Sequence, residues 1–525
     1  MIIRSPYPDV AIPEQPFTDF VLQQAQRLAD KPALIDGPSG RALTYGQLAA
    51  AIRRAAAGLA ARGFRKGDVL ALYSPNLPEY AVVFNAVASL GGINTTINPL
   101  YTAEELALQL NDSGARFLVT VGPFLDKAQD AAGQSKVEEI FVIGEGNGGT
   151  PFSALMETDT APPDVNISPR EDLVVLPYSS GTTGLPKGVM LTHYNLVANI
   201  CQTRGMGDFS GFGEQDTIIA VLPFFHIYGM IVVMSYGLSQ GATIVSMPRF
   251  DMAQFLEIMQ QHKVTIAPLV PPIVLGLAKQ PVVDNYDLSS LRLIFSGAAP
   301  LGEGLQREAS RRLGCEVIQG YGMTEASPVT HLSPDTPGMA RTGSVGFAVP
   351  NTEVKLVSTE TGAECETGEE GELYIRGPQI MRGYLNRPQE TAECLDEEGW
   401  YHSGDIGYVD EDGFFFIVDR VKELIKYKGM QVAPAELEAL LLTHPAVADV
   451  AVVPSPDEEA GELPKAFVVK SGEVTAEALM AFTAEHKAPH KRIRLVEFVD
   501  EIPKSASGKI LRRVLVDRER SRVAG

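Results

Sequence analysis

The chain has 525 residues, too many for one ordinary domain, so we expect two or more domains with ample apolar core. Its composition, 45% hydrophobic and 21% charged, is typical of a soluble globular enzyme. A formal net charge of -21 argues against nucleic acid or an anionic membrane as the main partner.

The first part of the chain alternates between strand-like and helix-like patterns. The expected elements are an amphipathic helix at 17–30, strands at 33–35 and 42–43, a helix from 44 to 61, a strand at 68–73, a helix at 78–90 and a strand at 93–96. Thr44 with Gln47 three residues later fits a capping box at the start of a helix. The alternation continues to about residue 330 and predicts α/β layers with a largely parallel sheet.

Two stretches resemble a dinucleotide-binding fingerprint and a membrane span, but we interpret both differently. Residues 144–149 match G-x-G-x-x-G, but Thr150 and Pro151 follow where a dinucleotide fingerprint would open a helix, so we predict a surface loop. Residues 218–245 are the most apolar stretch, yet Pro223, His226, Gly229 and Gly237 interrupt it. A buried strand, loop and helix explain it better than a membrane span.

The chain changes character twice after residue 330. Residues 343–418 hold short strands with Gly and Pro turns, which predicts an antiparallel or barrel-like β region. From residue 419 to the end there are 17 Lys and Arg and 17 Asp and Glu, so all of the net charge lies before it. This shift predicts a domain boundary, followed by a compact α/β unit with helices near 434–442 and 475–486.

The most informative stretch is residues 178–188, Tyr-Ser-Ser-Gly-Thr-Thr-Gly-Leu-Pro-Lys-Gly, which follows an apolar strand. Its glycines free backbone N–H groups for a bound anion, its hydroxyls can donate to phosphate oxygens, and its lysine adds a positive charge. Pro186 and Gly188 stand where a Walker A loop has Gly and Ser or Thr. We therefore predict a phosphate-binding loop of another kind; the alternative is a surface turn.

Further polar clusters follow along the chain. Residues 320–325, Gly-Tyr-Gly-Met-Thr-Glu, place a ring for stacking beside a carboxylate that suits Mg²⁺. Asp405 follows a glycine turn and can accept both hydroxyls of a ribose, although a turn aspartate often caps its own backbone. Basic residues alternate with mainly apolar ones over 420–428, which puts them on one face of a strand or on a solvated edge.

Two more residues are candidates for chemistry. Lys509 lies in a Ser- and Gly-rich loop near the end of the chain, from which a lysine can swing into an active site. His226 lies in an apolar run, where a histidine is usually a core residue, but Tyr228 and Gly229 beside it leave a pocket role open.

In this order, the motifs resemble those of the adenylate-forming superfamily of acyl-CoA synthetases, luciferases and carrier-protein adenylation domains. The resemblance covers residues 18–513 and is nearest to the 4-coumarate:CoA ligase group. The segments that carry it are 225–228, 319–326, 379–386 and 422–438.

The resemblance implies a large N-terminal domain, 1–418, of layered α/β subdomains with a β-barrel-like region. It also implies a small mobile C-terminal α+β domain, 419–525. ATP, Mg²⁺ and coenzyme A are the implied cofactors. A carboxylic acid would attack the α-phosphate of ATP to give an acyl-adenylate, and the CoA thiol would then displace AMP.

The resemblance also implies roles for individual residues. The catalytic set is Lys509, Lys426, His226, Thr324 and Glu325, with Glu325 as the Mg²⁺ ligand. The ATP and AMP set contains Thr324, Lys426 and Lys509 again, together with Ser179, Ser180, Gly181, Thr182, Thr183, Lys187, Gly297, Gln319, Gly320, Tyr321, Asp405, Arg420, Lys422 and Gln431. Arg249, Lys428 and Gly429 are candidates for CoA, and Tyr228, Val232, Ala298, Gly320, Pro328 and Val329 for the acyl group.

Within these roles, Lys422 is the expected hinge of the lid. Lys509 would act in adenylation, whereas Lys426 and Gln431 would act in thioester formation. Val232 stands where plant coumarate ligases often carry a polar residue, and Ser327 stands where many have Gly. An apolar lining of this kind also suits a less polar cinnamate, another aryl acid or a medium-chain fatty acid.

Other functions stay open at this stage: a luciferase-like oxygenase, an enzyme that loads a carrier protein, or a non-catalytic nucleotide-binding protein. The polar N-terminus, the four cysteines without a Cys-x-x-Cys pair and the absence of a Ser-Lys-Leu end favour the cytoplasm. We expect a monomer or weak homodimer that binds small molecules.

Overall fold

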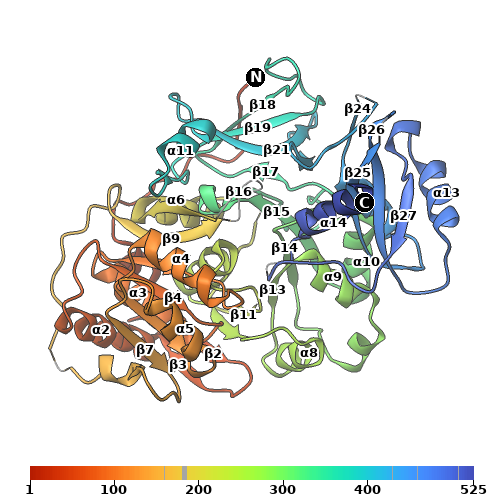
Figure 1. Cartoon of the computed structure of the whole chain (residues 1–525). Coiled ribbons are helices and arrows are strands. Elements are labelled where there is room, and N and C mark those ends of the chain that lie inside the picture. Colours follow the sequence, from red (N-terminus) through yellow and green to blue (C-terminus); the bar gives the residue numbers. More distant parts are fainter. Residues whose placement is uncertain are drawn as a thin grey trace.

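The computed structural model describes residues 1–158, 160–179, 186–207, 209–428, 430–457, 459–506 and 508–524. It is a mixed α/β protein with a large N-terminal part and a smaller C-terminal unit (Figure 1). The N-terminal part contains two mainly parallel sheets with helices, and the antiparallel sheet at the top of Figure 1 adjoins them. The C-terminal unit, in blue, lies beside α9 and α10.

The first sheet has the order β20-β10-β9-β5-β4-β6-β7-β8. Its strands are Gly383–Tyr384 (β20), Lys187–Thr192 (β10), Leu173–Ser179 (β9), Ile93–Thr96 (β5), Val69–Tyr73 (β4), Phe117–Val121 (β6), Glu139–Ile143 (β7) and Thr150–Pro151 (β8). Its helices are Tyr45–Ala61 (α2), Pro78–Ser89 (α3), Ala103–Ser113 (α4), Leu125–Ala132 (α5) and His193–Arg204 (α6). The pairs from β9 to β8 are parallel, as the alternating pattern predicts, and β10 and β20 add an antiparallel edge.

The second sheet has the order β17-β16-β15-β14-β13-β11-β12-β2-β3. Its strands are Phe347–Ala348 (β17), Val329–Leu332 (β16), Glu316–Gly322 (β15), Leu293–Ser296 (β14), Ile266–Leu269 (β13), Thr217–Ala220 (β11), Thr243–Ser246 (β12), Pro32–Asp36 (β2) and Ala42–Thr44 (β3). Helices Phe17–Val21 (α1), Gly237–Ser239 (α7), Met252–Gln261 (α8), Pro271–Lys279 (α9) and Glu303–Leu313 (α10) accompany it, with a π-helix at Tyr228–Tyr236.

The antiparallel sheet has the order β1-β18-β19-β21-β22, which confirms the predicted β region. Its strands are Ile3–Arg4 (β1), Glu353–Val357 (β18), Gly371–Arg376 (β19), Tyr401–Val409 (β21) and Phe415–Arg420 (β22), with helix Pro388–Cys394 (α11) nearby. Strand β22 pairs with β21 as far as Arg420, two residues beyond the predicted domain boundary. The boundary itself stays a prediction.

The C-terminal unit has apolar clusters of its own, such as Ile425, Leu437 and Val450. Its strands are Ile425–Tyr427 (β23), Met430–Val432 (β24), Val447–Asp457 (β25), Gly461–Lys470 (β26) and Leu495–Phe498 (β27), and its helices are Pro434–Leu441 (α12), Ala476–His486 (α13) and Arg512–Ala524 (α14). Because this unit buries its own core, it can keep its fold while its orientation changes.

Several local predictions are confirmed. The capping box of Thr44 and Gln47 starts α2, with hydrogen bonds in both directions. Residues 144–149 form a loop between β7 and β8. Residues 218–245 contain β11, the π-helix, α7 and the start of β12. Over the described part of the chain, no helix combines the length and apolarity needed to cross a membrane.

The predicted helix over residues 17–30 is wrong beyond Val21, where α1 ends. The next residues form successive turns, with bonds such as Ala25 N–H to Leu22 O at 2.8 Å. Ala25 and Leu28 are still buried. Turns of this kind bury residues at nearly the same spacing as a helix, so the apolar pattern does not separate the two.

Two buried histidines make stability depend on pH. His193 and His331 are fully buried, and each Nε2 lacks a hydrogen-bond partner among the described residues. Burial lowers the pKa of His193 to about 4 and that of His331 to about 3. Below about pH 6.5 the unfolded chain binds protons that the folded one excludes, so stability falls as the pH falls.

We expect each histidine to cost about 1.4 kcal/mol of stability at pH 5.5 relative to pH 7.5. Urea unfolding of the wild type and of a His193→Gln/His331→Gln variant across this range measures it. The variant is the control, because carboxylates titrate equally in both proteins. An equal loss of stability in the two proteins would contradict the assignment.

Candidate active site

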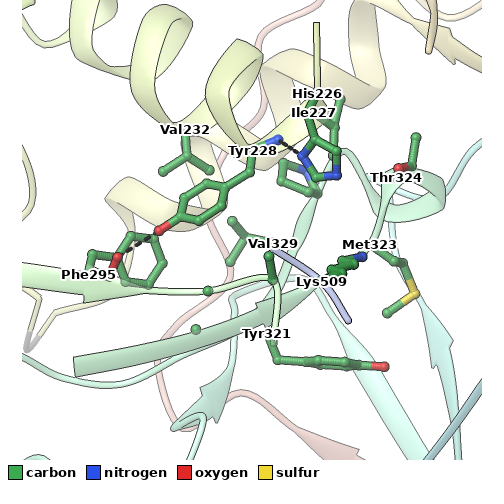
Figure 2. A pocket seen from close by; sticks show the side chains of 15 residues that line it. His226, Ile227, Tyr228, Val232, Phe295, Tyr321, Met323, Thr324, Val329 and Lys509 are labelled. Atoms are coloured by element: carbon green, nitrogen blue, oxygen red, sulfur yellow. Dashed lines mark hydrogen bonds between the residues drawn. The ribbon is translucent and has the colours of Figure 1, made fainter. Parts of the chain in front are cut away.

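One pocket collects residues from distant parts of the sequence (Figure 2). It is lined by His226, Ile227, Tyr228, Val232, Phe295, Gly297, Ala298, Gly320, Tyr321, Gly322, Met323, Thr324, Pro328, Val329 and Lys509. All six residues predicted to contact the acyl group lie in this set. The predicted catalytic residues His226, Thr324 and Lys509 lie in it as well.

The second sheet places this pocket at the carboxyl ends of its parallel strands. Gly297 follows β14 directly, and Gly320 and Tyr321 lie near the end of β15. A Cβ atom at Gly320 would lie 2.6 Å from the Phe295 ring, and one at Gly297 would lie 2.9 Å from the Tyr228 ring. Glycine is therefore needed at both positions for the rings to pack. Both glycines lie at the carboxyl edge of the sheet, where open α/β sheets bind ligands.

Tyr228 lines the pocket and is one of the residues predicted to contact the acyl group. Its hydroxyl donates to the backbone O of Phe295 at 2.7 Å, and burial raises the pKa of Tyr228 well above its usual value. The two rings meet edge to face with centroids 5.7 Å apart. The Tyr228 hydroxyl is thus a fixed donor to the protein, and its oxygen lone pairs stay available as acceptors.

His226 lies beside Tyr228 in the pocket lining and is a neutral hydrogen-bond donor. Its Nδ1 accepts from Tyr228 N–H at 3.3 Å, which assigns the ring proton to Nε2. Burial, with Lys509 close by, lowers the pKa of His226 to about 3. At neutral pH the imidazole can therefore donate one hydrogen bond to a ligand oxygen.

Lys509 enters the pocket from the C-terminal unit. Its loop is closed by Ser505 N–H to Lys509 O at 2.8 Å and by Gly508 N–H to Ser505 O at 2.9 Å. Gly508 has φ +78° and lies against Val270, where a Cβ would come within 2.9 Å. Figure 2 shows the Lys509 side chain reaching toward Met323 and Thr324. Burial lowers the pKa of Lys509, and the nearby Arg420 lowers it further.

Beside the pocket, Asp405 on β21 contacts side chains of two other strands, β15 and β22. Its carboxylate accepts from the Tyr321 hydroxyl at 2.5 Å and from Arg420 Nε at 2.9 Å. Asp405 is buried, and its charge raises the pKa of the Arg420 guanidinium further. The predicted ribose and base contacts therefore lie side by side.

The predicted metal ligand Glu325 is also buried. Its Oε1 accepts from the Ser179 hydroxyl at 3.0 Å and from the Tyr384 hydroxyl at 2.9 Å. Mg²⁺ usually takes only one or two carboxylates and completes its shell with phosphate and water oxygens. A single carboxylate with both donors on one oxygen fits that requirement, because among the described residues no donor bonds to Oε2, which could bind the ion.

The phosphate loop is described only at its ends. Ser179 and Lys187 are register partners on β9 and β10, so they face each other where the loop begins and ends. Ser180, Gly181, Thr182 and Thr183 lie outside the described residues. Lys187 Nζ lies 4.9 Å from the centroid of the Tyr384 ring.

Other predicted residues lie away from the pocket lining. The Gln319 amide is used by the protein: it accepts from Leu301 N–H at 2.9 Å and donates to Leu301 O and Gln306 Oε1. Lys422, Lys426, Lys428, Gln431 and Arg249 are exposed outside it. Gly429 lies outside the described residues.

Lys426 and Gln431 are nevertheless together. They are register partners on β23 and β24, so their side chains share one face of a hairpin. Lys428 pairs with Glu459 at 3.4 Å. The residues predicted for the second half-reaction thus form a group outside the pocket, while Lys509 occupies it.

Sequence reasoning missed Phe295, Met323 and Tyr384 as site residues. Phe295 reads as one more apolar residue of a buried strand, and only the pairing of strands shows that it supports Tyr228. Ser327, noted as a departure from glycine, has φ +69°, a conformation that favours glycine. Its hydroxyl donates to Gln379 O at 2.8 Å.

Comparisons with known proteins agree with this geometry. Residues 21–385 match the model of the AMP-binding enzyme family, and residues 436–509 match that of the AMP-binding enzyme C-terminal domain. The chain belongs to the AMP-binding enzyme family. It is an ATP-dependent acid:CoA ligase that works through an acyl-AMP.

Among curated relatives, the chain is 46% identical to 4-coumarate–CoA ligase 1 of Petroselinum crispum, over 100% of the chain and 97% of the relative. It is also 46% identical to 4-coumarate–CoA ligase of Pinus taeda, over 98% and 97%. Among solved structures, it is similar to the anthranilate CoA ligase AuaEII in complex with anthranoyl-AMP, with TM-score 0.90, 30% identity and coverage of 98% and 99%. A benzoate CoA ligase from Burkholderia xenovorans LB400 gives TM-score 0.86 and 26% identity, over 95% and 99%.

Proposed function

We propose that this family member joins 4-coumarate or a related hydroxycinnamate to CoA. The observation that carries the proposal is the pocket in which Lys509 and His226 lie beside a wall of apolar and aromatic residues, Tyr228, Val232 and their neighbours, which we call the acyl wall. Relatives named for 4-coumarate over the whole chain, and structural neighbours named for anthranilate and benzoate, support a planar aromatic acid.

In the first half-reaction, a carboxylate oxygen attacks the α-phosphorus of ATP. The bond to the bridging oxygen breaks, and pyrophosphate leaves. Lys509 neutralises charge between the carboxylate and the α-phosphate, while Thr324 and neutral His226 donate to oxygens there. Asp405 and Arg420 hold the ribose beside Tyr321. Ser179 and Lys187 lie on the pyrophosphate side.

Glu325 holds Mg²⁺ in this proposal, and the ion neutralises phosphate charge when bound. The chain's part is to aim the carboxylate. Ser179 and Tyr384 do this by donating to one of its oxygens.

The second half-reaction needs another orientation of the C-terminal unit. The thiol loses its proton to solvent, its sulfur forms the bond to the acyl carbon, and AMP leaves with the electron pair of the broken C–O bond. We assign Lys426 and Gln431 to this step, Lys422 to the hinge, and Arg249, Lys428 and Gly429 to CoA. Since Lys509 and Lys426 lie on different parts of one unit, both can act only if that unit turns.

We place the reaction in the cytoplasm, where the four free cysteines stay reduced. We propose a monomer or weak homodimer.

The acyl wall predicts a preference that one substitution will change. Val232 offers no hydrogen bond to a ring hydroxyl, so Val232→Ser is expected to improve kcat/KM for 4-coumarate relative to cinnamate by about 10-fold. Val232→Ala is the control, because it enlarges the pocket without adding a hydroxyl. Equal changes in the two variants would attribute the effect to volume.

Acid-dependent exchange of ATP with pyrophosphate tests the function as a whole. We would screen cinnamates, benzoates and fatty acids of graded length, then add CoA and measure the thioester. Exchange and thioester formation with hydroxycinnamates support the proposal. Exchange with aliphatic acids alone would overturn the substrate, and exchange without a CoA thioester would point to a carrier protein as acceptor.

A further inference from the structure

Tyr384 links two groups on the phosphate side of the site, although its own sequence position indicates no chemistry. It ends β20, the edge strand next to β10, and is buried. Its hydroxyl donates to Glu325 Oε1 at 2.9 Å, and its ring lies under Lys187 Nζ, 4.9 Å from the centroid. One side chain therefore contacts both the metal carboxylate and the lysine of the phosphate loop.

The backbone holds this tyrosine firmly. Val189 of β10 is its register partner, and Leu385 N–H donates to Gly188 O at 2.8 Å. Tyr384 N–H donates to Thr391 Oγ1 at 2.9 Å. The backbone that carries the Tyr384 ring is thus fixed to β10, the strand that begins at Lys187.

The Tyr384 hydroxyl is the donor in its hydrogen bond with the Glu325 carboxylate. Glu325 Oε1 receives this bond and the one from Ser179, so both donors act on the same oxygen. The other oxygen, Oε2, accepts no hydrogen bond from the described residues, so it is the oxygen that could bind an ion whose shell phosphate oxygens would complete.

We propose that Tyr384 is a positioning residue that aims the Glu325 carboxylate at Mg²⁺ through its hydroxyl and steadies Lys187 through its ring. The inference rests on the proposed function, because it takes Glu325 as the Mg²⁺ ligand and Lys187 as a phosphate contact. It assigns separate tasks to two parts of one side chain, so two substitutions can separate them.

The test measures ATP binding calorimetrically without any acid, so no reaction takes place, while MgCl₂ is varied. Tyr384→Phe keeps the ring and removes the hydroxyl. We expect it to raise the Mg²⁺ concentration for half-maximal enhancement of ATP binding by about 10-fold, the low end for losing a hydrogen bond to a metal ligand. ATP affinity without Mg²⁺ should stay within about 2-fold of wild type, because the cation–π contact is kept.

Tyr384→Leu removes both parts. It should show the same Mg²⁺ shift and, in addition, bind ATP about 2- to 5-fold more weakly without Mg²⁺, as the loss of a cation–π contact predicts. Tyr73→Phe is the matched control, because it removes a buried hydroxyl that donates only to backbone oxygens, including Pro99 O at 3.1 Å. Its Mg²⁺ dependence should equal that of wild type.

A wild-type Mg²⁺ dependence in Tyr384→Phe would overturn the inference, and so would an equal loss of ATP affinity with and without the ion. The exchange assay separates this outcome from failure of the proposed function. A wild type that binds Mg²⁺ and ATP but exchanges with no acid would remove the proposed activity and leave the Tyr384 result standing. Normal exchange with an unshifted Tyr384→Phe would overturn only the inference.

Discussion

Lys509→Ala is expected to lower the rate of acyl-adenylate formation by about 10²- to 10³-fold, the usual cost of losing one donor to a developing anion. The Lys509 ammonium is a cation in the pocket beside Thr324 and His226, and His226 is neutral at the working pH. No neutral donor replaces that charge. The measurement is single-turnover formation of acyl-AMP from ATP and acid.

The same variant should still convert presynthesised acyl-AMP and CoA into thioester at close to the wild-type rate. Lys504→Ala is the matched control. It lies in the same loop, but its ammonium pairs with Asp449 at 2.5 Å instead of entering the pocket. A comparable loss of adenylation in Lys504→Ala would show that Lys509→Ala acts through the fold of the loop.

Lys426→Ala is expected to have the opposite effect, with thioester formation falling by about 10²-fold and adenylation nearly unchanged. The structure holds Lys426 outside the pocket, exposed on β23 across from Gln431. It cannot contribute while Lys509 occupies the site. Acyl-AMP should therefore accumulate in the variant, and quenched-flow measurement of acyl-AMP and acyl-CoA would detect it.

Lys470→Ala is the control for this second prediction. Lys470 ends β26 of the same sheet and contacts the Phe498 ring, with Nζ 4.8 Å from the centroid. Its removal tests whether any lost surface charge of this unit slows the thioester step. If Lys426→Ala slowed both half-reactions equally, a lid that turns between two orientations would be contradicted.

Much of the fold was predictable, since it depends on local patterns. Strands β4 and β9 are largely apolar runs, and α2 starts at a capping box that spans only four residues. Predictions failed where two kinds of local structure bury apolar residues at the same spacing. The turns after Val21 are the example, since they hide Ala25 and Leu28 as a helix would.

The candidate site shows the same difference between what local patterns predict and what depends on contacts between distant segments. The resemblance named Tyr228, Gly297 and Gly320, and the pocket contains all of them. It did not predict that the Tyr228 hydroxyl is engaged by Phe295, which is 67 residues away. Nor did it predict that the Gln319 amide is used by Leu301 and Gln306. Such bonds depend on which strands are neighbours, and strand order is not a local property.

The sequence by itself determined the motifs, because their chemistry resides in residue type and close spacing: glycines beside hydroxyls, a lysine in a loop, a carboxylate after a ring. Only the tertiary structure decided that Lys509 occupies the pocket while Lys426 stays outside, and that Tyr384 contacts both Glu325 and Lys187. Those contacts join segments that are 59 to 197 residues apart or belong to different units. They follow from sheet order and from how the two units pack, free-energy differences summed over the whole molecule that no short segment contains.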